Sequence, residues 1–210
     1  MVSAQASLFE SAAVGVPSLG PLGDDVVRTE LGTGAWVDLR PGWVMGAAAL
    51  FEALSATVPW RSEQRPMYDR VVDVPRLQCF YDEGRSLPHP LLAEARRRLS
   101  AHYGPTLGEP LRTVGLALYR DGADSVAWHG DTIGRGSRHD TVVAIVSLGS
   151  ARRFLLRPRG GGPTRRLVLS AGDLLVMGGS CQRTWEHAVP KTTRPVGPRI
   201  SVQFRPRGVR

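Results

Sequence analysis

Four short apolar runs lie close together between residues 141 and 177, where the chain reads TVVAIVSLGSARRFLLRPRGGGPTRRLVLSAGDLLVM. The runs are residues 141–148, 153–156, 167–169 and 174–177. Glycine-containing clusters separate the later runs, at residues 160–163 and 170–173. Because short apolar runs with hairpin-type breaks between them are typical of antiparallel strands, this stretch predicts a β-structure built from hairpins.

The same pattern of short apolar runs continues on both sides of this stretch and predicts the fold class. Further short runs lie at residues 114–119, 126–129 and 200–204. So many closely spaced strands favour a double-stranded β-helix, or jelly roll, as the core over residues 109–206. Two helices precede it and are expected to cover one sheet, so the predicted class is α+β, mainly β.

The two covering helices are predicted from their apolar spacing and their end signals. In the first, residues 43–58, two leucines and a valine recur four positions apart and a proline follows. The second, residues 91–103, begins after a proline and ends before a glycine. Both patterns predict amphipathic helices that bury one face.

The chain has 210 residues, enough for one sizeable core, and we expect a single domain over residues 31–210. Residues 1–30 mix serine, alanine, glycine and proline with weak apolar runs and show no sustained period. They are therefore predicted to form a flexible N-terminal arm.

Composition excludes several classes of protein. Two cysteines, Cys79 and Cys181, cannot build a disulfide framework or a four-thiolate zinc site. No stretch approaches the roughly 20 apolar residues that a membrane span requires, and the first residues lack the basic start of a secretory signal. We therefore expect a cytoplasmic protein without a membrane segment.

The chain is strongly basic, with 27 lysine and arginine residues against 19 acidic residues and a net charge of +8. Eight arginines fall between residues 135 and 166, where Asp140 is the one acid. A local excess of positive charge attracts polyanions and releases counterions from a phosphate backbone. A nucleic acid partner is therefore favoured, although an arginine-rich genome would produce the same excess of arginine over lysine.

Residues 128–131 read Trp-His-Gly-Asp, which places His129 and Asp131 two positions apart. On an extended segment both side chains leave the same face and can converge on one ion. His187, after the run at 174–177, is available as a third ligand. Two imidazoles and one carboxylate suit non-haem Fe(II), whereas zinc prefers a more closed shell. The bare His-x-Asp pattern is common by chance, and a lone histidine on a strand is usually structural.

The final predicted strand, residues 199–205 (Arg-Ile-Ser-Val-Gln-Phe-Arg), alternates between polar and apolar side chains. Arg199 and Arg205 share its polar face, opposite an apolar face that is typical of a core strand. Buried guanidinium groups are costly unless an anion pairs with them. A small dicarboxylate in the mouth of the barrel would be such an anion, and the spacing permits this arrangement without requiring it.

With these residues in this order, the chain resembles the AlkB family of Fe(II)- and 2-oxoglutarate-dependent dioxygenases. The resemblance covers roughly residues 65–206. It is carried by His129-x-Asp131, the distal His187, and Arg199 followed by Arg205. Two shorter stretches are also similar to the family, Ser147-Leu148-Gly149 with Arg153-Phe154, and residues 171–177 before the distal histidine.

The resemblance implies a set of ligands. The two histidines and the aspartate would bind Fe(II) and form the catalytic centre. Arg199 with Tyr119 would bind the distal carboxylate of the co-substrate 2-oxoglutarate, and Arg205 would lie near its keto-acid end. O2 would take the remaining position at the iron.

Two positions depart from the family pattern. Where the family usually has Asn-x-Tyr, this chain has Ala117-Leu118-Tyr119, so one expected polar contact to the co-substrate is absent. The acidic residues usual after the iron-binding aspartate are replaced by Thr132 and Ile133, which leaves the identity of the recognised base open. Neither change affects the expected iron ligands.

The activity implied by the resemblance is oxidative demethylation of N-alkylated bases, with release of formaldehyde, succinate and CO2. The alkylated atom is inaccessible in a duplex, so the base must be flipped out or unpaired, and then stacked. Residues 65–90 resemble the family's nucleotide-recognition cover, in which Arg76, Gln78 and Tyr81 would contact the base or a phosphate. Candidates for stacking are Trp128, Trp185, Phe80 and Tyr81. A plain hairpin, and tryptophans that only pack beside the iron ligands, are the structural alternatives.

The sequence therefore predicts a monomeric dioxygenase that repairs alkylated nucleic acid, DNA being favoured over RNA. Two alternatives stay open. One is a 2-oxoglutarate hydroxylase of the same fold that acts on a protein, lipid or small molecule. The other is a non-catalytic, cupin-like nucleic-acid-binding module whose histidines are structural.

Overall fold

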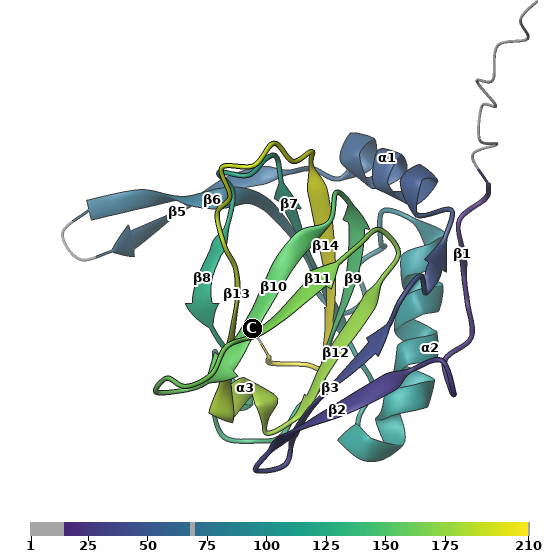
Figure 1. Cartoon of the computed structure of the whole chain (residues 1–210). Helices are drawn as coiled ribbons and strands as arrows, with labels where there is room; N and C mark the ends of the chain where they lie inside the picture. Colours follow the sequence, from purple (N-terminus) through teal and green to yellow (C-terminus); the bar gives the residue numbers. More distant parts are fainter. Residues whose placement is uncertain (1–14, 68–69, 210) are drawn as a thin grey trace, which may run out of the picture.

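The computed structural model describes residues 15–67 and 70–209, which form two large antiparallel sheets, a small two-stranded sheet and two long helices (Figure 1). The larger sheet has the strand order β2 (Val27–Gly32), β3 (Ala35–Arg40), β12 (Leu174–Gly179), β9 (Val143–Gly149), β14 (Arg199–Arg205), β7 (Thr113–Tyr119), β6 (Arg70–Tyr81), β5 (Arg61–Met67). The smaller sheet has the order β11 (Arg165–Leu169), β10 (Arg152–Pro158), β13 (Trp185–Val189), β8 (Val126–His129). The arrangement confirms the predicted class, α+β and mainly β with a jelly-roll core.

Each of the seven predicted apolar runs forms a strand of its own, and β13 is the strand in this region that the runs do not predict. Its sequence, Trp-Glu-His-Ala-Val, mixes charged and apolar residues, so it shows no apolar run. Strands from before residue 109 also join the larger sheet, β2 and β3 at one edge and β5 and β6 at the other.

Alternation along the strands divides the apolar side chains into two cores, one on each face of the larger sheet. In β12, Leu174 and Val176 pack in the core beneath the helices. Leu175 and Met177, at the intervening positions, pack in the core between the two sheets. A strand buried on both faces therefore reads as a continuous apolar run.

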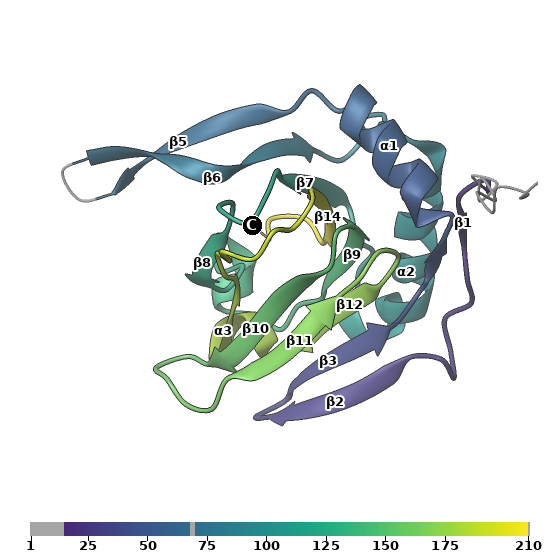
Figure 2. The ribbon, with the colours of Figure 1, turned by 45° about the horizontal axis from the view of Figure 1, so that its top comes forward.

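Two helices, α1 (Ala47–Thr57) and α2 (Pro90–Leu107), pack on the face of the larger sheet away from the smaller one (Figure 2). α1 begins later than predicted because the preceding residues form a short strand, β4 (Val44–Met45). α2 continues past Gly104 and ends at Gly108, which adopts the left-handed conformation with φ 73°. In the described part of the chain, neither helix is long and apolar enough to cross a membrane.

The N-terminal segment is folded against the domain, which corrects the predicted arm for its described part, residues 15–30; residues 1–14 lie outside the described residues. Within it, β1 (Ser18–Leu19) pairs with β4, and β2 forms an edge of the larger sheet. Periodicity is weak here because few of these residues are buried, but strand pairing needs only backbone groups.

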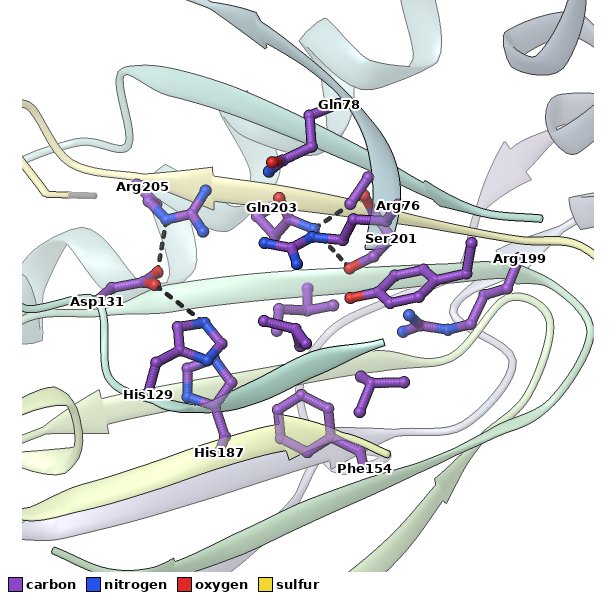
Figure 3. Close-up of a pocket in the computed structure, with 15 residues that line it drawn as sticks. Arg76, Gln78, His129, Asp131, Phe154, His187, Arg199, Ser201, Gln203 and Arg205 are labelled. Carbon is purple, nitrogen blue, oxygen red and sulfur yellow. Dashed lines mark hydrogen bonds and ion pairs between the residues drawn. The ribbon is translucent and has the colours of Figure 1, made fainter. Parts of the chain in front are cut away.

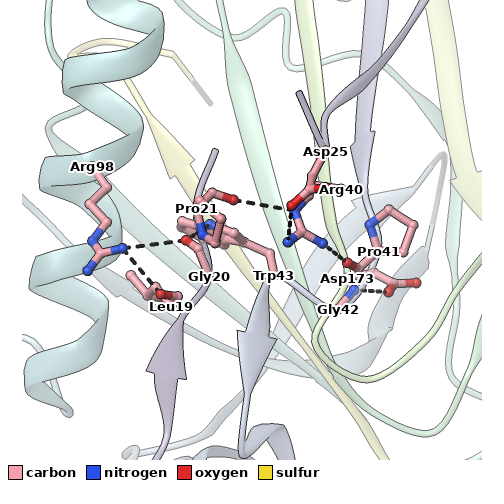
Figure 4. Close-up of polar contacts among 10 residues, drawn as sticks. All are labelled: Leu19, Gly20, Pro21, Asp25, Arg40, Pro41, Gly42, Trp43, Arg98 and Asp173. Carbon is pink, nitrogen blue, oxygen red and sulfur yellow. Dashed lines mark hydrogen bonds and ion pairs between the residues drawn. The ribbon is translucent and has the colours of Figure 1, made fainter. Parts of the chain in front are cut away.

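Arginine side chains supply further partners to this segment (Figure 4). Arg98 of α2 donates to the carbonyl of Leu19 at 3.2 Å. Arg40 of β3 donates to the carbonyl of Pro21 at 3.3 Å and pairs with Asp25 at 2.9 Å. Some of the arginines of this basic chain therefore stabilise the fold.

The segment predicted as a cover, residues 65–90, contains the end of β5 and the whole of β6. These two strands pair as a hairpin that projects beyond β8 (Figures 1 and 2). The base of β6 pairs with β7, so the hairpin is continuous with the larger sheet. Residues 76–81 form the C-terminal half of β6.

Candidate active site

Three potential metal ligands meet at one end of the cavity between the two sheets (Figure 3). His129 ends β8 and lies directly opposite His187 of β13 in the antiparallel pairing. Asp131 follows two residues after His129, and one ligand atom from each of the three residues lies within 4.8 Å of the others. The structure thus brings together the three residues that the sequence predicts as iron ligands.

Their electrostatic environment keeps these groups in the forms that coordinate a cation. Burial lowers the pKa of His187 to about 3 and also lowers the pKa of His129. Burial by itself raises the pKa of Asp131, but the charge and hydrogen bond of Arg205, together with the two neighbouring histidines, outweigh it and the pKa falls to about 2. Neutral imidazoles and an ionised carboxylate are the forms that bind divalent metals.

Hydrogen bonds fix the orientation of these ligands. His129 Nδ1 lies 2.8 Å from the carbonyl oxygen of Ala127. Because a carbonyl only accepts, Nδ1 carries the proton and Nε2 presents its lone pair to the cluster. Arg205 Nε donates to Asp131 Oδ2 at 2.6 Å, which leaves Oδ1 directed at the histidines.

Two residues that the sequence analysis did not single out also hold the cluster. The buried Gln182 accepts the backbone N–H of Asp131 at 2.8 Å. Phe154 stacks on the His187 ring, with centroids 5.3 Å apart. Phe154 belongs to a motif that resembles the family, whereas no sequence signal marks Gln182, because its contact depends on how the short helix α3 (Cys181–Thr184) packs.

Close packing requires a glycine at position 130, between the ligands His129 and Asp131. A Cβ atom there would lie 2.4 Å from the carbonyl oxygen of Gln182. The turn between His129 and Asp131 can therefore approach α3 only if this residue has no side chain.

The opposite end of the cavity is built to hold an anion. Arg199 is 1% exposed, and its Nε donates to Ser147 Oγ at 2.9 Å. Its Nη1 is buried and has no hydrogen-bond partner among the described residues. Tyr119 lies opposite Arg199 in the β7–β14 pairing, and its ring centroid is 5.2 Å from the guanidinium carbon. An unpaired buried guanidinium is costly, so these residues fit a carboxylate.

The wall between the two ends is the polar face of β14. The pocket is lined by all four residues of that face, Arg199, Ser201, Gln203 and Arg205. The alternation predicted from the sequence is therefore correct. Ser201 and Gln203 also join the site, although no role was predicted for them. Ala117 lies opposite Ser201 and offers the pocket only a methyl group.

Residues predicted to contact substrate divide between the two faces of β6. Arg76 and Gln78 line the pocket, and Arg76 Nη1 donates to the carbonyl of Ser125 at 3.2 Å. Tyr81 packs against the core beneath the helices, where burial raises its pKa to about 12. This corrects the prediction for Tyr81: it is an odd number of residues from Gln78, so its side chain points to the other face.

Two other stacking candidates also lie outside the pocket. Trp128 precedes His129 on β8 and faces the outside of the smaller sheet, where Arg157 stacks on its ring at 4.1 Å. Trp185 is 8% exposed and lies in the core between the sheets. Phe80, 38% exposed, remains, because it shares the face of β6 that carries Gln78. The prediction that Trp128 contacts the flipped base is therefore corrected.

The basic segment of residues 135–166 is used partly by the fold. Arg152 is buried and donates to the carbonyls of Asp121, Asp124 and Pro190. Arg157 pairs with Glu186 at 3.0 Å. The exposed arginines of this segment that take no part in such contacts are Arg138, Arg153, Arg165 and Arg166.

Comparison with known proteins gives a family. The model of the 2OG-Fe(II) oxygenase superfamily matches residues 45–205. Alpha-ketoglutarate-dependent dioxygenase alkB homolog 3 of Homo sapiens is 31% identical over 197 residues, which cover 80% of this chain and 65% of that protein. DNA oxidative demethylase ALKBH2 of Homo sapiens is 29% identical, over 63% of this chain and 56% of that protein. The chain spans less than two thirds of the length of these relatives.

Solved structures with little sequence identity share the fold. OsALKBH1 superposes with a TM-score of 0.59 at 15% identity, covering 84% of this chain and all of that one. An oxidoreductase of the 2OG-Fe(II) oxygenase family from Burkholderia pseudomallei superposes with a TM-score of 0.53 at 16% identity, covering 80% of this chain and 84% of that one. Since the superfamily model spans most of the chain and the fold agrees with it, the protein belongs to the 2OG-Fe(II) oxygenase superfamily.

Proposed function

We propose that the protein is an Fe(II)- and 2-oxoglutarate-dependent oxidative demethylase of N-alkylated bases in DNA. One observation carries the proposal: a ligand cluster for a divalent metal and the unpartnered Nη1 of buried Arg199 lie in the same pocket. This combination fits a metal and a dicarboxylate bound side by side. The similarity to alkB homolog 3 and to DNA oxidative demethylase ALKBH2 supports alkylated DNA as the substrate class.

Each part of the pocket has a role in this proposal. His129, Asp131 and His187 bind Fe(II), which with 2-oxoglutarate and O2 supplies the oxidising chemistry. Arg199 and Tyr119 bind the distal carboxylate of 2-oxoglutarate. Arg205 holds Asp131 through one carboxylate oxygen and lies near the keto-acid end of the co-substrate.

The nucleic acid approaches from the hairpin side of the pocket. Arg76 lines the pocket and belongs to β6, one strand of the hairpin that projects beyond β8 (Figure 2). Exposed arginines such as Arg153 and Arg166, neighbours on the outer face of the smaller sheet, supply backbone contacts. The base enters flipped out or unpaired. We further propose that the protein acts as a monomer in the cytoplasm.

Formaldehyde release tests this function. The protein is incubated with Fe(II), 2-oxoglutarate and an oligonucleotide containing 1-methyladenine, and loss of the methyl group is followed by mass. We expect turnover that declines as salt rises, because a phosphate-contacting enzyme loses affinity with salt. The variant His129→Ala should lose at least about 1000-fold in succinate formation and still bind the oligonucleotide, since the metal supplies the oxidising chemistry.

Three other outcomes would contradict the proposal. No release from single- or double-stranded oligonucleotides would exclude repair of this lesion. Salt-independent succinate formation with a protein or small-molecule substrate would favour the hydroxylase of the same fold. Absence of iron-dependent succinate formation, with oligonucleotide binding intact, would favour a non-catalytic binding module.

A further inference from the structure

Gln78 presents a hydrogen-bond acceptor that the protein does not use. Its Oε1 is buried and has no partner among the described residues, although the side chain lines the pocket. Figure 3 shows the amide end of Gln78 turned from β6 into the pocket, on the side of Gln203 and Arg205. Buried acceptors are nearly always satisfied, so one left open inside a pocket indicates a donor that arrives with a ligand.

The polar side chains around Gln78 are directed at other acceptors. Arg76 donates to the carbonyl of Ser125, and Gln203 donates to the carbonyl and hydroxyl oxygens of Ser201 at 3.0 and 2.7 Å. Across the strands, Gln78 lies opposite Ala117 of β7, whose methyl group cannot donate, and opposite Arg61 of β5, whose exposed side chain makes no hydrogen bond to Oε1. The described residues next to Gln78 therefore leave its Oε1 open.

A flat apolar surface lies beside this acceptor. Phe80 follows two residues after Gln78 on the same face of β6 and is 38% exposed. It pairs with Gly115, where an added Cβ would lie 3.7 Å from the Phe80 ring and 2.9 Å from Arg205 Nη1. The glycine leaves room for the side chains of Arg205 and Gln203 next to the Phe80 ring. An aromatic ring on the same strand face as a buried acceptor suits a planar base.

The position that usually supplies an acid for base recognition offers none in this chain. Ile133 is apolar and 66% exposed, and Thr132 has no carboxylate. An acceptor for the base must come from elsewhere, and Gln78 has one. Adenine and cytosine carry an exocyclic amino group as a donor, whereas thymine and uracil carry a carbonyl oxygen at that place.

Resting on the proposed function, we propose that Gln78 selects alkylated adenine and cytosine by accepting a hydrogen bond from their exocyclic amino group at Oε1. A base with a carbonyl oxygen at this position would place two acceptors against each other. Sites built to hydrogen-bond one group reject analogues that lack it, because the buried polar group stays unpaired.

The test uses two oligonucleotides that differ at one place, with 3-methylcytosine or 3-methyluracil in the same sequence. Initial rates are measured with Fe(II), and dissociation constants are measured with Mn(II) and 2-oxoglutarate without oxygen. We expect the wild type to prefer 3-methylcytosine in both measurements. Gln78→Leu should reduce the preference about tenfold, as for one lost hydrogen bond, and Gln78→Glu, which keeps an acceptor, should retain it.

Gln64→Leu is the matched control, because Gln64 is exposed on the same hairpin and should leave the preference unchanged. An equal preference in wild type and Gln78→Leu would overturn the inference and assign any preference to the charge of 3-methylcytosine. Weaker 2-oxoglutarate binding in Gln78→Leu, with the preference intact, would also overturn it. If neither base is demethylated but binding still discriminates through Gln78, the proposed activity fails and the inference stands.

Discussion

Two buried arginines lie beside the Tyr119 ring and have opposite surroundings. Arg152, 4% exposed, has its guanidinium carbon 5.7 Å from the ring centroid and donates to three backbone carbonyls. Arg199, 1% exposed and 5.2 Å from the ring centroid, donates to Ser147 and leaves Nη1 without a partner among the described residues. Both residues are buried arginines, and they differ in the hydrogen-bond acceptors that surround the guanidinium group.

Two buried aspartates differ in the same way, in how fully the protein supplies hydrogen bonds to the carboxylate. Asp38 receives two hydrogen bonds from Arg28, at 2.7 and 2.9 Å, and a third from the hydroxyl of Tyr103 at 3.0 Å. Asp131 has one oxygen bound by Arg205, while the other faces two neutral histidines. A buried charge that the protein satisfies stabilises the fold, whereas one that it leaves partly open is reserved for a ligand.

Arg199→Met should have the largest effect, on ligand binding. Removing the guanidinium should weaken 2-oxoglutarate binding by at least about 100-fold, because a desolvated carboxylate loses its charged partner. Stability of the ligand-free protein should change little, since the guanidinium has no acidic partner among the described residues. Titration of the Mn(II) form with 2-oxoglutarate and a denaturant melt measure the two quantities, and a strongly destabilised ligand-free variant would contradict this account.

Arg152→Met should show the reverse pattern. The three carbonyls that accept from Arg152 lose their donor, so the free energy of unfolding should fall by about 2–3 kcal/mol. The affinity of the folded fraction for 2-oxoglutarate should stay within about threefold of the wild type, because such small changes lie within ordinary coupling between separate sites. Urea denaturation and the same titration measure both, and the control is Arg153→Met at an exposed neighbour. A large loss of affinity would place Arg152 in the binding site instead.

Tyr103→Phe should have a smaller effect, confined to stability. The hydroxyl donates to a carboxylate that Arg28 already pairs, so its removal should cost about 1 kcal/mol of unfolding free energy. Burial and the charge of Asp38 raise the pKa of Tyr103, so the hydroxyl stays protonated in the folded protein throughout the neutral range. Thermal melts at neutral pH measure the change, and altered 2-oxoglutarate affinity would argue against a purely structural role.

The smallest effect is expected for alkylation of Cys181 in the folded protein. Cys181 is buried in the core between the two sheets, and burial raises its pKa to about 12. The thiolate is therefore scarce at pH 8, and iodoacetamide should leave Cys181 unmodified in the folded protein and alkylate it after denaturation. Peptide mass spectrometry distinguishes the two states. Rapid modification of the folded protein would show that this part of the core is open to solvent.

Much of the site follows from patterns within single strands. Successive side chains of a strand point to opposite faces, so Arg199 and Arg205 had to share a face. The same rule predicted that His129 and Asp131 converge, but β8 ends at His129 and a turn brings Asp131 to the cluster. The same rule separates Tyr81 from Gln78 and was available in the sequence. The alternation rule does not say which face of β6 meets the pocket, because both faces of that strand carry apolar and polar residues.

Contacts between distant segments required the folded chain. The pairing of β13 with β8 places His187 against His129, and the loop that carries Asp121 and Asp124 satisfies Arg152 rather than Arg199. Backbone geometry sets the direction of a side chain from its immediate neighbours, so local patterns are readable in the amino-acid order. Which acceptors surround that side chain depends on segments far away in the chain, and only their packing shows which buried charges remain open for a ligand.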